Sequence, residues 1–264
     1  MRTPYRISHL LAAACLAACL VGGMSASGQE EKWGYRTKEA DWNWVDKLEY
    51  RASADQYHFT KGTFGGELAR ASVVDLSVPR PADFDKYAAQ IKDTADPSAI
   101  AAMEEIVRRY SMLKWDVEGL KLLVPIYLKK REFDKVYSSG DNIRKTGASL
   151  PPELLSAYWE SLNAKNMPEK LKQEIKDAIE SGPRQSAAVA YVARGDLLQK
   201  DRKKQEAVVQ YLRTIICFGD VRAIQPEALF KLTKLLKELN DPRAEKMKRK
   251  LLDEYPDSIY LKDI

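Results

Sequence analysis

Few residues of this chain have both the type and the spacing that catalysis requires. After the first 28 residues, His58 is the only histidine and Cys217 the only cysteine, which excludes a site built on two histidines and an intramolecular disulfide. A histidine-dependent triad would have to use His58. Cys217 stands in the apolar stretch 214–218, where a free cysteine behaves as a small buried hydrophobic residue. We therefore expect Cys217 to be buried and unreactive.

The glycine-rich and acidic stretches are also poor candidates for chemistry. The run Gly62–Gly66 lacks the lysine, the hydroxyl residue and the helix with which a phosphate-binding loop holds nucleotides, so it predicts a turn. Neighbouring carboxylates such as Glu104 and Glu105, or Asp253 and Glu254, point about 100° apart on a helix and cannot converge on one ion. The sequence predicts no enzyme activity, no cofactor and no metal site.

The balance of charge argues against nucleic acid as a partner. Without residues 1–28, 41 lysines and arginines stand against 38 aspartates and glutamates. So small an excess in a chain of this length indicates a mixed, solvated surface. Two basic runs, 129–131 and 200–204, fall in expected turns. They would either form one positive stripe along a repeat array or be ordinary solvated helix ends.

The first 28 residues have the three-part organisation of a secretory signal peptide. Arg2 and Arg6 precede an apolar run over 10–24, and small residues follow over 25–28. The apolar run has 15 residues, fewer than the roughly 20 that a transmembrane helix needs. We expect an exported protein of a bacterial cell envelope, either periplasmic or anchored to a membrane as a lipoprotein.

Two cleavage sites compete within this signal. The residues before Cys19, Leu16-Ala17-Ala18, resemble the lipobox of bacterial lipoproteins, in which the cysteine is lipidated and becomes the new N-terminus. Ordinary cleavage near Ser27 is the alternative. The first would attach the protein to a membrane, and the second would release it.

Residues 29–80 form a segment with a composition of its own, rich in Trp, Tyr, Gly, Ser and Thr. A short helix is expected over 41–50. Strands are expected over 56–63 and 67–78, joined by a hairpin turn at Gly65–Gly66.

Three tryptophans lie close together in this segment: Trp33, Trp42 and Trp44. They could cover the apolar end of a helical array, dock a partner, or stack on sugar rings. The sequence leaves these three roles open.

Residues 81–264 consist almost entirely of amphipathic helix interrupted by proline and glycine. Several helices are expected to begin at a proline, which fits the first helical turn, as at Pro97 and Pro168. Short turns between helices make neighbours antiparallel. The expected helices cover 82–93, 97–113, 117–130, 133–146, 151–164, 168–181, 184–199, 203–218, 225–239 and 242–255.

These helices recur as hairpins with a nearly constant period. Val136, Leu171, Ala207 and Ala244 each stand early in the second helix of a hairpin, and they are 35, 36 and 37 residues apart. This spacing is close to the period of about 34 residues in tetratricopeptide repeats.

The stretch 191–219 resembles a tetratricopeptide repeat most closely. Small residues stand where two helices would cross, and larger ones fill the layer between them. The small residues are Gly195 and Ala207, and the larger ones are Tyr191, Leu198 and Tyr211. The last unit has Ala244 in the place of Ala207 and ends in Tyr255-Pro256, an ending common in such repeats of bacterial envelope proteins.

The resemblance implies a mainly α fold, a solenoid of antiparallel helical hairpins. In such proteins the first helix of each hairpin lines a concave surface that holds a peptide or a partner protein without a cofactor. The candidate groove residues at the corresponding positions are Asn163, Arg194, Gln199, Lys231 and Lys234. The implied function is an envelope scaffold or adaptor. A glycan- or peptidoglycan-binding protein that uses the tryptophans is the second hypothesis.

Intact-mass analysis of the native protein distinguishes the two cleavage outcomes. Lipidation predicts a chain that begins at Cys19 and carries two or three acyl groups. Ordinary cleavage predicts a chain that begins near Gly28 and carries no lipid. A chain that still begins at Met1 in the mature protein would contradict export by either route.

Overall fold

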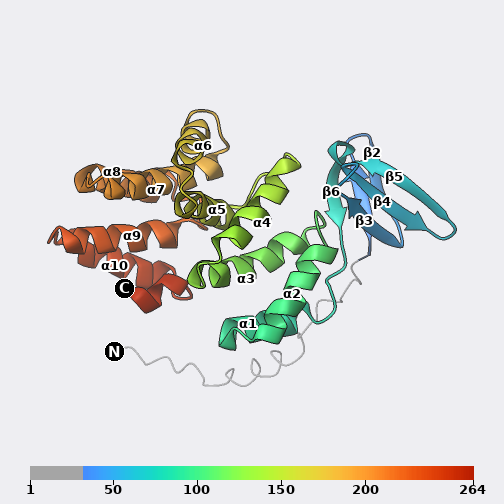
Figure 1. Cartoon of the computed structure of the whole chain (residues 1–264), viewed down its shortest axis with the longest axis horizontal. Coiled ribbons are helices and arrows are strands. Elements are labelled where there is room, and N and C mark those ends of the chain that lie inside the picture. Colours follow the sequence, from blue (N-terminus) through green and yellow to red (C-terminus); the bar gives the residue numbers. More distant parts are fainter. Residues whose placement is uncertain (1–31) are drawn as a thin grey trace, which may run out of the picture.

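The computed structural model describes residues 32–264, which form a strand-rich N-terminal region followed by helices (Figure 1). The expected signal peptide over 1–28 and the expected lipidation site Cys19 lie outside the described residues. Within residues 32–264, no helix is both long and apolar enough to cross a membrane. The expectation of a mainly α fold with a small strand-containing N-terminal segment is confirmed.

The N-terminal region contains two antiparallel sheets of three strands each. The strand order is β2-β1-β6 in the first sheet and β3-β4-β5 in the second. The strands are β1 (Gly34–Thr37), β2 (Ala40–Trp44), β3 (Lys47–Arg51), β4 (Gln56–Lys61), β5 (Phe64–Ala69) and β6 (Val73–Ser77).

The helix expected over 41–50 is wrong, because these residues form β2 and β3. Trp44 pairs with Gly34 of β1, whereas Leu48 pairs with Phe59 of β4. The chain thus passes from one sheet to the other between these two residues. The apolar residues over 41–50 have the spacing of one helical face, but they lie on two separate strands. Pairing with neighbouring strands decides the conformation of aromatic and β-branched residues.

A hairpin is present, but its turn lies at Gly62 and not at Gly65–Gly66, and the single strand expected over 67–78 is wrong, since β5 ends at Ala69 and β6 belongs to the other sheet. Lys61 of β4 pairs with Phe64 of β5 across the turn, and Gly62 has a φ of +58°, which suits glycine. Gly66 lies inside β5, where a Cβ atom would come within 2.7 Å of the Phe59 ring. Glycine is needed at position 66 because an aromatic ring lies across it.

The helices follow the expected ranges closely. The main difference is at α2, which ends at Arg109 because Met112 and Lys114 have positive φ angles that a helix does not allow. The helices are α1 (Phe84–Thr94), α2 (Pro97–Arg109), α3 (Trp115–Lys129), α4 (Phe133–Lys145), α5 (Pro152–Ala164), α6 (Pro168–Glu180), α7 (Arg184–Lys200), α8 (Lys204–Cys217), α9 (Gln225–Glu238) and α10 (Arg243–Glu254), followed by a short 3-10 turn, η2 (Ile259–Asp263).

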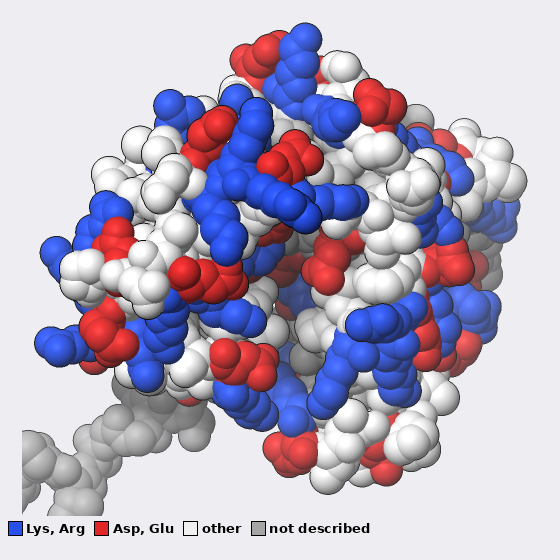
Figure 2. All heavy atoms as spheres, turned by 60° about the vertical axis from the view of Figure 1, so that its left-hand side comes forward, with Lys and Arg blue, Asp and Glu red and all other residues white. Residues whose placement is uncertain are grey.

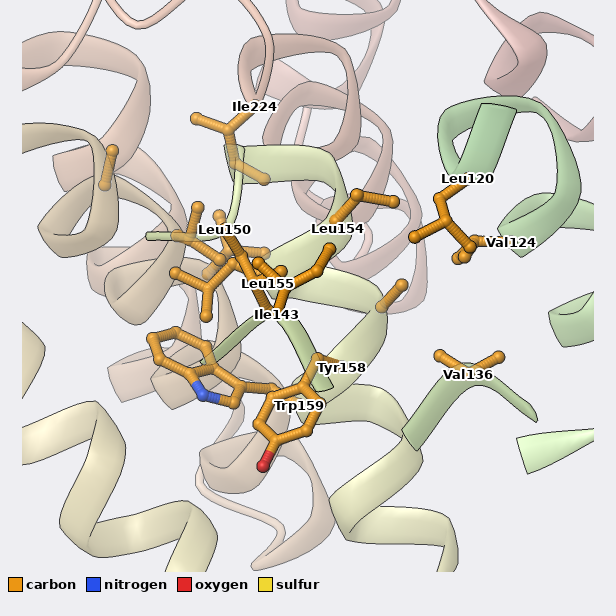
Figure 3. Close-up of a cluster of buried hydrophobic side chains, with 14 of the residues drawn as sticks. Leu120, Val124, Val136, Ile143, Leu150, Leu154, Leu155, Tyr158, Trp159 and Ile224 are labelled. Carbon is orange, nitrogen blue, oxygen red and sulfur yellow. The ribbon is translucent and has the colours of Figure 1, made fainter. Parts of the chain in front are cut away.

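Each helix packs against the next one in the chain, and α5 also packs against α3 and α7. Buried side chains from the β-sheets to α10 belong to one continuous hydrophobic core. Figure 3 shows a central part of this core, where Leu120 of α3 and Val136 of α4 lie near Leu155 and Tyr158 of α5. Because α5 contacts four other helices, it holds the middle of the array together.

Two glycines determine how closely neighbouring helices approach. A Cβ atom at Gly195 of α7 would come within 2.5 Å of the Tyr211 ring on α8. A Cβ atom at Gly140 of α4 would come within 2.6 Å of the Tyr158 ring on α5. Both tyrosine side chains are almost completely buried. Each tyrosine ring therefore occupies the space that a side chain at the facing glycine would need.

The other residues expected to pack between the hairpins occupy different environments. Ala207 and Ala244 are buried, and Leu198 is partly buried against the core. Tyr191 packs against Phe218, with their ring centroids 5.6 Å apart. Pro256, after the last helix, is exposed.

Cys217 is exposed, so its expected burial is wrong. It lies in the last turn of α8, where Thr214 and Ile215 face the core and Ile216 is 73% exposed. In this stretch, the face of the helix on which a side chain stands decides whether it is buried, and not how apolar the side chain is.

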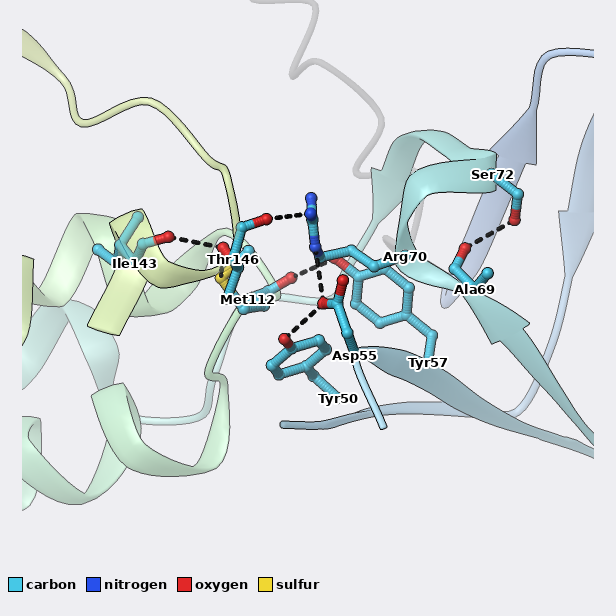
Figure 4. A network of polar contacts seen from close by, with 9 residues as sticks. All are labelled: Tyr50, Asp55, Tyr57, Ala69, Arg70, Ser72, Met112, Ile143 and Thr146. Carbon is cyan, nitrogen blue, oxygen red and sulfur yellow. Dashed lines mark hydrogen bonds and ion pairs between the residues drawn. The ribbon is translucent and has the colours of Figure 1, made fainter. Parts of the chain in front are cut away.

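The N-terminal region docks on the first helices through side chains that bind backbone carbonyls (Figure 4). The Tyr57 hydroxyl donates to the Met112 carbonyl at 2.9 Å, in the turn between α2 and α3. Burial raises the pKa of Tyr57 to about 12, so the phenol keeps its proton at neutral pH. Arg70 donates to the Thr146 carbonyl after α4 and pairs with Asp55 at 2.8 Å.

The fit of Gly195 against Tyr211 predicts that Gly195→Ala destabilises the protein. Helix propensity alone would make this change stabilising by about 1 kcal/mol. The clash with a fully buried ring is expected to outweigh that gain and to lower the free energy of unfolding by about 1–3 kcal/mol. Urea unfolding followed by circular dichroism measures the difference.

Gly219→Ala is the control, because the nearest atom to a Cβ there is the Ile215 carbonyl oxygen at 3.7 Å, an ordinary contact. Unfolding free energies that are equal for both variants, or higher for Gly195→Ala, would show that the ring does not limit position 195.

Candidate functional site

A cavity of about 630 Å³ lies between α3, α5, α9 and η2. A second cavity of about 300 Å³ lies along α5, α7 and α9, and it shares Ser156 and Glu160 with the first. We call the two together the inner groove. Figure 2 shows the helical part of the molecule from the side of α8 and α10, with a hollow in the surface and both acidic and basic side chains around it.

The inner groove contains a network of charged side chains centred on Lys231 of α9. The Lys231 ammonium lies 2.6 Å from a carboxylate oxygen of Asp196 on α7 and 2.6 Å from one of Glu227 on α9. The Ser156 hydroxyl of α5 donates to Glu227 at 2.9 Å. The Tyr211 hydroxyl of α8 donates to Asp196 at 2.6 Å. One ammonium group thus links polar groups from four helices.

The surroundings of this network shift the pKa values of its members. Burial raises the pKa of Asp196, and repulsion from Glu227 adds to this, while Lys231 acts in the opposite direction. Burial alone would lower the pKa of Lys231, but attraction to Glu227 and Asp196 outweighs it and raises the pKa well above the ordinary value. Lys231 therefore stays charged, whereas burial favours the neutral form of Asp196.

No ion pair or hydrogen bond joins Glu160 of α5 to another residue within 32–264, and the same holds for Glu153 and Asp257 in the larger cavity. Glu160 lines both cavities. Burial raises its pKa, as do the nearby carboxylates of Glu227 and Asp196, while Lys231 lowers it. Three carboxylates thus lie near one ammonium group that pairs with only two of them, Asp196 and Glu227, and this part of the groove has an excess of negative charge when they are ionised.

Two of the five expected groove residues lie in this groove. Asn163 and Lys231 line the smaller cavity together with Glu160 and Asp196. The sequence did not indicate the acidic residues, although each stands on the first helix of a hairpin beside buried positions. That placement is the signal that could have identified them.

The other three expected residues lie elsewhere. Arg194 lines a separate cavity of about 360 Å³ between α6 and α7. Gln199 donates a hydrogen bond of 2.5 Å to the Tyr211 hydroxyl and supports the network from behind. Lys234 is exposed, with its ammonium 5.1 Å from the centre of the Phe230 ring. All three stand on the expected helices but do not line the inner groove.

The three tryptophans do not form one surface. Trp33 stacks on Tyr110, next to the turn that follows α2, with ring centroids 6.0 Å apart. Trp42 and Trp44 stack on each other at 5.4 Å and are 36% and 47% exposed. The Arg36 guanidinium lies 6.0 Å from the Trp42 ring. Trp33 thus covers the end of the helices, and the other two form an exposed aromatic pair on β2.

His58 lies in β4 between Glu49 of β3 and Glu67 of β5. Its Nδ1 atom is buried and has no hydrogen-bond partner within the described part of the chain. No group of three or more His, Cys, Asp or Glu side chains within residues 32–264 is arranged to hold a metal ion.

The basic runs are partly used in contacts inside the chain. Lys200 donates to Asn163 at 3.1 Å, and Lys204 pairs with Glu238 of α9 at 3.1 Å. These lysines join successive hairpins at the edge of the array.

Comparison of the chain with protein-family models, with curated proteins and with solved structures gives no match. The function proposed below is therefore inferred from the residues and the geometry of this chain.

The shared ammonium group predicts that Lys231→Met destabilises the protein. Removal of the cation leaves Asp196 and Glu227 close together without compensation. We expect a loss of about 1–3 kcal/mol at pH 7, below the value for a fully buried pair because water still reaches these side chains. The control is Lys234→Met on the exposed side of α9, with an expected change under about 0.5 kcal/mol.

The loss caused by Lys231→Met is expected to shrink as the pH falls from 7 to 4. The pKa of Asp196 is raised in the folded protein, so the folded state takes up a proton here more readily than the unfolded chain. Protonation removes the repulsion that Lys231 otherwise offsets. Urea unfolding at several pH values tests this, and a loss that grows towards acid pH would contradict it.

Proposed function

We propose that this chain is a non-catalytic adaptor of the bacterial cell envelope that binds a protein or peptide partner in the inner groove. The observation that carries the proposal is a cavity of about 630 Å³ that opens between helices, with apolar walls and a few polar groups. Cavities of this kind are the usual binding sites of folded proteins. The residues that line it come from helices far apart in the sequence.

The helical hairpins form a solenoid of tetratricopeptide type in this proposal. Two features support it. The first helices α3, α5 and α7 pack against one another in turn, while each second helix packs against the first helix of the next hairpin. A glycine also lies against a tyrosine ring at two helix contacts, Gly140 of α4 with Tyr158 of α5 between hairpins and Gly195 of α7 with Tyr211 of α8 within one hairpin. Stacked hairpins of this kind present an extended concave surface.

Export and attachment to a membrane are part of the same proposal. They rest on the signal-like first 28 residues and on the lipobox-like residues before Cys19. An adaptor of this type would act in the periplasm or at a membrane surface, where it would help to assemble a multiprotein complex.

A second candidate function, glycan or peptidoglycan binding, is favoured by the exposed pair of Trp42 and Trp44. Flat aromatic rings stack on sugar rings, and Arg36 beside them could bind a hydroxyl or a carboxylate. This site would be smaller than the one first expected, because Trp33 packs against Tyr110.

Site-specific photo-crosslinking in the native envelope tests the groove. A photoreactive benzoylphenylalanine replaces Ile259, which lines the groove and is 62% exposed. We expect a reproducible crosslink to one polypeptide, whose crosslinked segment, made as a synthetic peptide, competes for the same site.

The matched control is the same replacement at Ile216, an isoleucine of α8 that is 73% exposed and does not line the groove. Equal crosslinking from both positions would sink the proposal. If instead the protein sediments with peptidoglycan, and a Trp42→Ala, Trp44→Ala variant does not, the second function gains and the first loses.

A further inference from the structure

We propose that the inner groove binds an extended polypeptide segment in which a lysine or arginine stands between apolar residues, with its cation paired to Glu160. This inference rests on the proposed function, since it specifies the chemistry of the partner that the groove holds.

The need for a cation follows from the charges inside the groove. Lys231 is shared by Asp196 and Glu227, which leaves Glu160 without a partner among residues 32–264. Glu160 lines both parts of the groove, so a guest in either part can reach its carboxylate. Glu160 is exposed, so a guest ammonium or guanidinium group can reach its carboxylate and complete the charge balance with a charge-assisted hydrogen bond.

The apolar side chains that line the larger cavity indicate that the guest has apolar residues on either side of its cation. Leu128 of α3, Leu154 of α5 and Ile259 of η2 line it. Ile259 is 62% exposed, a large apolar surface that an apolar guest would cover. A small hydrated cation would leave these walls in contact with water, whereas an aliphatic side chain would remove them from it.

The proposal that the guest is a polypeptide follows from a proline within α3. Pro125 has no N–H group, so the carbonyl of Lys121 does not receive the usual hydrogen bond from four residues further on. Both residues line the larger cavity. Where the backbone of a guest reaches Lys121, its N–H groups are donors complementary to this carbonyl.

Other occupants fit the groove less well. Nucleic acid would bring phosphates next to Glu160, Asp196 and Glu227. A divalent metal ion needs several converging ligands, and the described part of the chain holds no group of three or more His, Cys, Asp or Glu side chains arranged for one. A polyamine has the cation but not the apolar groups, so it becomes an outcome of the test.

The test is selection from a displayed library of random nonapeptides on the mature protein. On the unchanged protein we expect enrichment of peptides with Lys or Arg between apolar residues. On Glu160→Lys the enriched peptides should carry Asp or Glu instead. Glu169→Lys, on the exposed side of α6, is the matched charge reversal and should select the same peptides as the unchanged protein.

The isosteric variant Glu160→Gln guards against a failure of Glu160→Lys to fold, with circular dichroism as the check on both. By fluorescence anisotropy, the best selected arginine peptide should bind the unchanged protein about ten times more tightly than the same peptide with citrulline, a difference of roughly 1.4 kcal/mol. The ratio should fall to about one in Glu160→Gln.

Several results would overturn the inference: no enrichment of basic peptides, a citrulline peptide that binds equally well, or spermidine that competes as strongly as the peptide. If Ile259 still crosslinks one partner while the arginine preference is absent, the groove function stands and only the chemistry assigned to Glu160 fails. If the crosslink also fails, the proposed function itself is wrong.

Discussion

The pairing of the Lys231 ammonium group with two carboxylates is the interaction on which the arrangement of the inner helices depends. The ammonium lies 2.6 Å from carboxylates on α7 and α9, two helices that otherwise contact each other little. Without it, their carboxylates would repel each other across the space between the hairpins. Hydrogen bonds from Ser156 and Tyr211 extend the network to α5 and α8. A polar network of this kind fixes the spacing of the helices, because each partner accepts only a narrow range of distances.

The fold was predictable where local signals and packing agree. Prolines and amphipathic periodicity located the helices, as at Pro97 and Pro168, because these signals act within a few residues. The strands were harder, since the residues over 41–50 take their conformation from partners far away in the sequence. For the same reason the turn was predicted at Gly65–Gly66, whereas it lies at Gly62. Glycine is needed at position 66 because the Phe59 ring of the neighbouring strand lies against it.

The candidate site was predictable only in part for a related reason. The repeat resemblance indicated the first helices of the hairpins, and Lys231 and Asn163 do line the groove. It could not indicate Glu160, Asp196 and Glu227, because an acidic residue on an amphipathic helix looks like part of a solvated face. Which face lies inside depends on the rotation of each helix against its neighbours. Tyrosines lying against glycines at 140 and 195 set that rotation, and this is a property of three-dimensional packing.

The N-terminal sheets and η2 both pack on the helices, which bears on how the inner groove behaves when it is empty. The sheets are fixed to the first helices by Tyr57 and Arg70. Tyr260 of η2 stacks on Phe230 of α9, with ring centroids 5.1 Å apart. Arrays of stacked hairpins fray from their ends, where each unit has only one neighbour. With the sheets and η2 held in this way, we expect the inner groove to keep its shape when it is empty, so that the partner proposed above would bind with little entropic penalty for ordering the protein and at a rate set mainly by encounter.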